Sequence, residues 1–199
     1  MKLRKEIIYL LLINLLSLPA YSQQWFDGSL VLSNGNVRVG RISIECDHDL
    51  VLFEQEAVRT VYPAHKIQSV YFYDYTTNVN SRYQSLRKSE GVGSRFYLYE
   101  VVLAGEIDVL RRKKSSAFPK HTAPTDYNYF IHHNNVLVPL RKFKRKIFPY
   151  IQSSSDKWLK EFITAKRLNI QLPANAIRII EYYNSVVKDL NPIAKNSKI

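Results

Sequence analysis

The residues best suited to chemistry in this chain are cations in two short runs. Lys and Arg number 29 against 17 Asp and Glu, a net charge of +12 at pH 7, and the excess lies mainly between residues 107 and 150. A concentrated positive field attracts anionic partners and is screened over about 10 Å at ordinary salt. We therefore take the runs as a candidate polyanion-binding site made of Arg111, Arg112, Lys113, Lys114, Arg141, Lys142, Lys144, Arg145 and Lys146. A solvated loop and the polar face of a helix would give the same pattern without any site.

The single cysteine lies in a second polar cluster, Cys46-Asp47-His48-Asp49. Consecutive residues of a strand point to opposite sides, so only a sharp turn could bring these four side chains together. One thiol beside one imidazole also lacks the paired ligand spacing of a zinc site. We expect a polar turn with a half-buried Cys46, and we assign no metal site and no cofactor.

The histidines and the known catalytic motifs give no catalytic residue. We expect His132 and His133 at a hairpin tip, and His65 and His121 in loops. The sequence contains no Gly-x-Ser-x-Gly elbow, phosphate-binding loop, dinucleotide fingerprint or His-Glu-x-x-His pair. An enzyme is therefore the less favoured class, although Cys46 beside one of the histidines stays open as a hydrolase nucleophile.

Tyrosines, 14 in all, recur at alternate positions of three segments. These segments are Tyr71–Tyr75, Tyr97–Tyr99 and Tyr127–Tyr129. Alternate residues of a strand share a face, so each segment presents a row of rings. The row either packs beneath the helices or forms an open aromatic platform for a sugar or a peptide.

The amino terminus has the layout of a signal peptide over residues 1–22. Three basic residues precede an apolar stretch from Ile7 to Leu18, and Ala20-Tyr21-Ser22 supplies the small residues of a cleavage site before Gln23. The apolar stretch is shorter than the roughly 20 residues that span a bilayer. We expect export to the periplasm or cell envelope, with no transmembrane span in the mature chain.

Residues 23–139 read as a β-rich domain of about nine strands. Asn34-Gly35 is a tight hairpin turn, while Tyr75–Gly93 and Lys113–Thr125 read as exposed connections. The predicted strands are Phe26–Leu32, Val37–Ile44, Asp49–Glu54, Ala57–Tyr62, Ile67–Asp74, Arg95–Leu103, Ile107–Arg112, Asp126–His132 and Val136–Val138. Short strands joined by turns favour an antiparallel meandering sheet that curls toward a barrel or folds into a sandwich.

Residues 140–199 change to helical periodicity and form a helical C-terminal region of two to three helices. The first begins at Leu140 and meets Pro149, the second covers Asp156–Leu168 with Ser155 as its N-cap, and the third covers Pro173–Leu190. Each carries an apolar stripe that needs a partner. The fold class is therefore α+β, with the helices packed on the sheet.

Several short motifs resemble an uncharacterised exported β-rich protein family of Bacteroidota. The matching segments are Ala20-Tyr21-Ser22-Gln23, the run from Gly28 to Asn36, Gly40-Arg41-Ile42, Tyr62-Pro63 with Ile67, Gly105-Glu106-Ile107, and Ile180-Glu181-Tyr182-Tyr183-Asn184. The chain has Asn36 where such proteins often have Asp. The resemblance implies an export-linked β module with no assigned activity, and it supplies no catalytic residue.

Three functions remain as hypotheses. The first is a non-catalytic exported binding or structural module of the cell envelope, whose partner is an envelope protein or an anionic envelope surface. The second is a basic-surface module that docks on anionic lipid or glycan, because export makes nucleic acid an unlikely partner. The third is a hydrolase with a noncanonical site.

Overall fold

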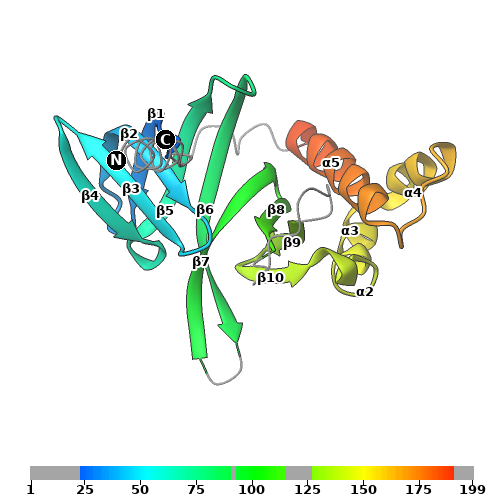
Figure 1. Cartoon of the computed structure of the whole chain (residues 1–199). Coiled ribbons are helices and arrows are strands. Elements are labelled where there is room, and N and C mark those ends of the chain that lie inside the picture. Colours follow the sequence, from blue (N-terminus) through cyan, green and yellow to red (C-terminus); the bar gives the residue numbers. More distant parts are fainter. Residues whose placement is uncertain (1–22, 91–92, 115–126, 191–199) are drawn as a thin grey trace, which may run out of the picture.

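The computed structural model describes residues 23–90, 93–114 and 127–190, which form an antiparallel sheet followed by helices (Figure 1). The sheet has ten strands in the order β10-β9-β8-β7-β6-β5-β1-β2-β3-β4. The strands are β1 (Phe26–Leu32), β2 (Val37–Glu45), β3 (Leu50–Gln55), β4 (Val58–Pro63), β5 (Ile67–Asp74), β6 (Val79–Glu90), β7 (Gly93–Leu103), β8 (Asp108–Lys113), β9 (Tyr127–His133) and β10 (Val136–Pro139). The sheet is open, with β10 and β4 as its outer strands, and the α+β class with a meandering sheet is confirmed.

Turn chemistry explains the β1–β2 and β9–β10 hairpins. Gly35 has φ of +86° between β1 and β2, and Asn134 and Asn135 have φ of +48° and +59° between β9 and β10. Glycine adopts such angles freely, and asparagine tolerates them better than most residues. The Asn-Gly and Asn-Asn signals therefore place these two turns correctly.

The segment predicted as a loop over Tyr75–Gly93 is mostly strand. Of its described residues, 75–90 and 93, Tyr75–Asn78 form a turn, and the twelve-residue β6 follows, paired with β5 on one side and β7 on the other. The sequence did not predict β6 because the strand is rich in polar residues, and most of its described side chains are only partly buried. Lys113, predicted in a connection, ends β8, and residues 115–126 lie outside the described part of the chain.

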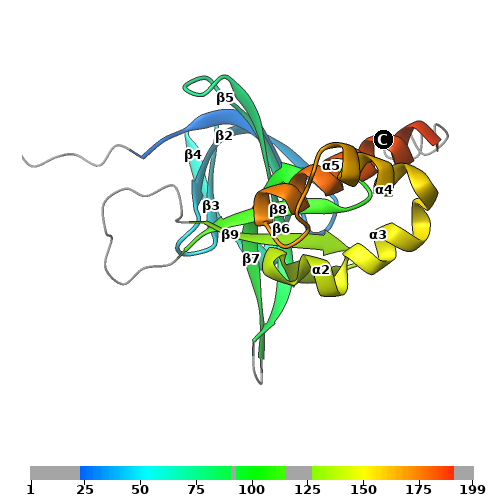
Figure 2. The same cartoon turned by 90° about the vertical axis from the view of Figure 1, so that its right-hand side faces the viewer.

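The first five strands curl around a shared interior. A 3-10 turn, η1 (Ala64–Lys66), leads the chain from β4 back to β5, which pairs with the free side of β1. One core cluster gathers buried side chains from five strands and η1: Leu30, Ile42, Val51, Phe53, Ala64, Ile67, Val70, Phe72 and Leu98. Because β3 and β7 are not neighbours in the strand order, these residues can meet only if the sheet bends, as Figure 2 shows.

Helices follow directly after β10. They are η2 (Leu140–Lys142), α2 (Phe143–Lys146), α3 (Phe148–Ser154), α4 (Asp156–Ala165) and α5 (Pro173–Leu190). The first predicted helix is broken into three short pieces, and Pro149 sits in the first turn of α3, where its missing N–H leaves no hydrogen bond unmade. Ser155 occupies the N-cap of α4, but the predicted capping bond is wrong, since its buried hydroxyl makes none.

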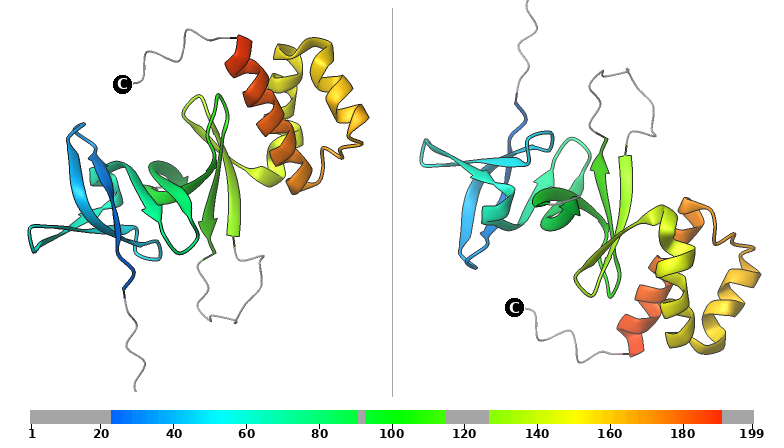
Figure 3. Two further views of the ribbon diagram at one scale, coloured as in Figure 1. Left: turned by 90° about the horizontal axis from the view of Figure 1, so that it is seen from above. Right: turned by 90° about the horizontal axis from the view of Figure 1, so that it is seen from below.

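The helices pack on one end of the sheet (Figure 3). Their core cluster joins Val109 and Ile131 of the sheet, and Ile107 just before β8, to helix residues Phe143, Ile151, Leu159, Ile179 and Ile180, among others. A third cluster, Tyr99 with Leu110 and Phe130, lies on the opposite face of β8 and β9, because neighbouring residues of a strand point to opposite sides. None of the helices in the described ranges is long and apolar enough to cross a bilayer.

Candidate functional site

The first basic run is largely taken up by ion pairs. Arg111 of β8 donates two hydrogen bonds to the Glu100 carboxylate of β7, at 2.7 and 2.5 Å, and its guanidinium lies 4.6 Å from the Tyr127 ring centroid. The bonds to Glu100 raise the pKa of Arg111 above its ordinary value. The paired β strands place the two residues opposite each other. Arg111 is therefore held within the sheet rather than presented to a partner.

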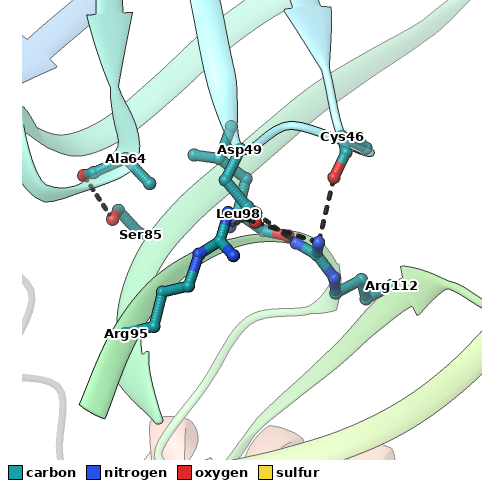
Figure 4. A network of polar contacts seen from close by, with 7 residues as sticks. All are labelled: Cys46, Asp49, Ala64, Ser85, Arg95, Leu98 and Arg112. Atoms are coloured by element: carbon teal, nitrogen blue, oxygen red, sulfur yellow. Dashed lines mark hydrogen bonds and ion pairs between the residues drawn. The ribbon is translucent and has the colours of Figure 1, made fainter. Parts of the chain in front are cut away.

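Arg112, the next residue, points to the other face and enters a polar network (Figure 4). Its guanidinium binds both Asp49 carboxylate oxygens, and it donates to the Cys46 carbonyl at 3.0 Å and the Leu98 carbonyl at 3.2 Å. The side chains of Arg112 and Asp49 are 17% and 4% exposed. The guanidinium is therefore engaged by one carboxylate and two carbonyls inside the fold, and removal of Asp49 would leave its charge unpaired.

Asp49 is the centre of that network, whereas the sequence analysis named it only as one member of a polar turn. It lies in the β2–β3 turn with φ of +57°. Its carboxylate accepts from the Leu98 N–H at 2.9 Å, and its carbonyl accepts from the Ala64 N–H at 2.9 Å. The turn, η1 and β7 are thereby joined. No local pattern could reveal this role, because the partners are far apart in the sequence.

The second basic run lies on η2 and α2. Leu140, Phe143 and Ile147 are 4%, 1% and 5% exposed and belong to the core beneath the helices. The cations between them are all exposed: Arg141, Lys142, Lys144, Arg145 and Lys146. We call these five residues the α2 basic surface. All five cations of the second run are thus exposed, whereas only Lys113 and Lys114 are exposed in the first run.

Cys46 is not a poised nucleophile. It lies partly buried in the β2–β3 turn, and burial raises the pKa of its thiol from 9.0 to about 11. The thiol is therefore protonated at neutral pH, whereas a nucleophilic cysteine needs the thiolate. Within the described ranges, no three His, Cys, Asp or Glu side chains are grouped to hold a metal ion. The turn itself is as expected.

His132 and His133 lie within a strand rather than at a hairpin tip, whereas His65 lies in an exposed turn as expected. His132 and His133 end β9, one residue before the turn. His133 is only 8% exposed, with Nδ1 3.2 Å from the Glu106 carbonyl, and His132 Nδ1 is 3.6 Å from Asp108 Oδ2. His65 is exposed in η1, and His121 lies outside the described residues. β9 extends one residue further than expected and pairs His133 with Val136, so His133 is buried rather than exposed at the hairpin tip.

The tyrosine rows are divided between core and surface. Tyr99 is 1% exposed and packs edge-on to Phe130, with ring centroids 5.2 Å apart, on the face away from the helices. Tyr97 contacts cations from Lys88, Arg95 and Arg112 at 4.7 to 5.6 Å. Tyr71 is 39% exposed beneath Arg82. The helices therefore cover part of one row, since Tyr129 packs against their core cluster. The rings of Tyr71, Tyr97 and Tyr127 instead have arginine guanidinium groups over them.

Two motifs that carry the family resemblance meet in space. The Asn184 side chain of α5 accepts from the Ile107 N–H at 3.0 Å and donates to the Ile107 carbonyl at 2.8 Å. A Cβ on Gly105 would lie 2.2 Å from the Asn184 amide nitrogen. Likewise, Gly28 and Gly40 are direct partners across β1 and β2. These short motifs thus lie where α5 packs closely on the chain before β8, and where β1 and β2 pair through two glycines.

Geometry therefore defines the class of the molecule as an open, curled, ten-strand antiparallel sheet with helices packed on one end. No protein-family model, curated protein or solved structure matches the chain.

Proposed function

We propose that the protein is a non-catalytic binding module exported to the cell envelope, and that the α2 basic surface docks it on anionic lipid or glycan. Export rests on the signal-like residues 1–22, which lie outside the described part of the chain. The observation that carries the docking step is the exposure of five cations on a segment whose apolar residues are buried. An envelope protein with an acidic face is the alternative partner of the same surface.

The anchoring of the segment supports docking over mere solubility. Leu140, Phe143 and Ile147 pack into the core with residues of the sheet and α5, so the backbone that carries the five cations is held in place. Because this backbone is already ordered, the segment loses less conformational entropy when its side chains bind an anionic surface. Each Lys or Arg near an acidic bilayer contributes about 1 kcal/mol, so five residues give about 5 kcal/mol.

A vesicle binding assay tests the proposal. We expect co-sedimentation of the protein with vesicles of phosphatidylglycerol and phosphatidylcholine at low salt, and release at high salt. Replacing the α2 basic surface with five Gln residues is expected to weaken partitioning by about 1000-fold or more. These side chains are exposed, so the variant keeps the buried anchors and the fold.

A matched control removes the same charge elsewhere. Arg38, Lys157, Lys160, Arg167 and Lys188 are also exposed, and replacing all five with Gln is expected to weaken binding much less. Equal loss in both variants would mean that net charge alone drives binding, and unchanged binding in the α2 variant would end the docking proposal. Export is checked separately by the mass of the secreted chain, which starts at Gln23 if cleavage follows Ser22.

A further inference from the structure

One edge of β7 is not paired with a strand along its first half. β6 pairs with β7 from Gly93 to Glu100, whereas β8 pairs with β7 only from Glu100 onward. Within the described residues, Ser94, Arg95 and Phe96 face the β2–β3 turn and η1 across a cavity, where no strand pairs with this side of β7. Free strand edges present backbone donors and acceptors that need partners.

Main-chain geometry shows which groups point to that edge. The Leu98 N–H binds Asp49 and its carbonyl accepts from Arg112, so both point away from β6. In an antiparallel strand the N–H and C=O of every second residue share a direction. The register is regular from Gly93 to Leu98, so the N–H groups of Phe96 and Ser94 also point to the free edge.

A cavity of about 330 Å³ lies along this edge. Its walls are Ser94, Arg95 and Phe96 on one side and the β2–β3 turn and η1 on the other, where His48 and His65 line it. Both imidazoles are exposed, and Arg95 is 63% exposed. Figure 4 shows the Arg95 side chain reaching from β7 toward Asp49.

The charges around the cavity favour an anion. Asp49 also lines it, but its carboxylate is 4% exposed and already bound by Arg112 and the Leu98 N–H. Arg95 Nη2 lies 3.8 Å from Asp49 Oδ2, beyond hydrogen-bond distance, so its donors can still serve a ligand. The other charged neighbours in sequence are Asp47 beside His48 and Lys66 beside His65.

We propose that this cavity binds an oxyanion of the phosphate or sulfate type. The guanidinium of Arg95 and the N–H groups of Ser94 and Phe96 supply hydrogen bonds, as in other oxyanion sites. His48 and His65 line the opposite wall of the cavity, where their ring N–H groups can donate further hydrogen bonds to the same oxyanion. The site is separate from the α2 basic surface and does not depend on the docking proposal.

Sulfate is the probe of choice because it is a tetrahedral oxyanion whose charge is constant around neutral pH. We expect saturable sulfate binding by calorimetry at pH 7 and constant ionic strength. In amide NMR spectra the shifts should centre on Ser94 and Phe96. Arg95→Gln is expected to weaken binding about tenfold, and His48→Gln with His65→Gln to weaken it by a smaller factor, because the charge-assisted bonds come from Arg95.

Arg38→Gln is the matched control, since it removes an exposed cation from the β1–β2 hairpin and should leave sulfate binding unchanged. All substituted side chains are exposed, so each variant folds. A repeat with inorganic phosphate and then with phosphatidylglycerol vesicles separates the sources. Shifts at Ser94 with vesicles indicate a lipid phosphate, and shifts with free phosphate alone indicate a small molecule. Wild-type affinity in Arg95→Gln, or shifts confined to the α2 basic surface, would overturn the proposal.

Discussion

Neighbouring arginines illustrate how little residue type says about role in this molecule. Arg111 and Arg112 are identical and adjacent, yet one binds Glu100 on one face of β8 and the other binds Asp49 on the opposite face. Strand alternation predicts that they diverge. It does not predict that both meet carboxylates, because Glu100 and Asp49 reach them only through strand pairing and the curl of the sheet.

The buried thiol of Cys46 leads to a pH-dependent prediction. Its pKa is raised in the folded state, so the neutral thiol stabilises the fold fully below about pH 9, and that contribution is lost as pH rises toward about 11. Between these values the wild type should lose up to about 2 kcal/mol more of its free energy of unfolding than Cys46→Ala does. Urea denaturation at pH 8 and pH 11 measures the difference.

Alkylation provides a second check on the same residue. Native protein should react slowly with iodoacetamide at pH 8, and urea-unfolded protein quickly, because only the unfolded thiol ionises there. Rapid native labelling, or parallel pH curves for the wild type and Cys46→Ala, would contradict the assignment and restore Cys46 as a nucleophile candidate.

Elements with strong local signals were predicted well. β1, β5 and α5 have the predicted bounds, since each combines apolar periodicity with a turn, a proline or a glycine at its end. β6 was missed because it lies between β5 and β7 with polar side chains, and its identity comes from backbone pairing on both sides. A strand held by its neighbours needs little hydrophobic pattern of its own.

The contact between α5 and the start of β8 should be sensitive to single changes. Asn184→Ala leaves the fully buried N–H and C=O of Ile107 without partners, and we expect a loss of about 2 to 4 kcal/mol in the free energy of unfolding. Ser185→Ala, one residue further and exposed, should change it by less than about 0.5 kcal/mol. Urea titrations of both variants measure the two values.

Gly105→Ala tests the same contact from the other side. The added Cβ displaces the Asn184 side chain, so the double variant with Asn184→Ala should be less destabilised than the sum of the single variants. Additive effects would mean that the glycine and the asparagine act independently.

At the scale of the whole molecule, the Asp49 network holds the curl. It ties the β2–β3 turn and η1 to β7 and β8, which lie on the other side of β1 in the strand order. Ser85 of β6 adds a hydrogen bond of 2.6 Å to the Ala64 carbonyl. In a closed barrel, pairing between the first and last strands fixes the curvature. In this open sheet, side-chain and main-chain bonds of Asp49 connect the two curled parts instead.

Breaking this tie should destabilise the entire sheet. Asp49→Asn can still accept from the Leu98 N–H but leaves the charge of Arg112 unpaired, and we expect a loss of about 3 kcal/mol or more. Glu54→Gln is the control, because it removes a carboxylate that pairs with the exposed Arg41 and Arg59, and should change stability little. Equal denaturation midpoints for the two variants would show that the network does not hold the curl.

The sequence by itself determined most hairpins, the change from strand to helix after Pro139 and the two basic runs, because turn residues, hydrophobic periodicity and charge are local properties. Only the tertiary structure decided which cations remain exposed and that Asp49 is a central anchor. Only it placed His48, His65 and Arg95 around one cavity. The reason is that burial and pairing depend on residues far apart in the chain, which strand order and curvature bring together.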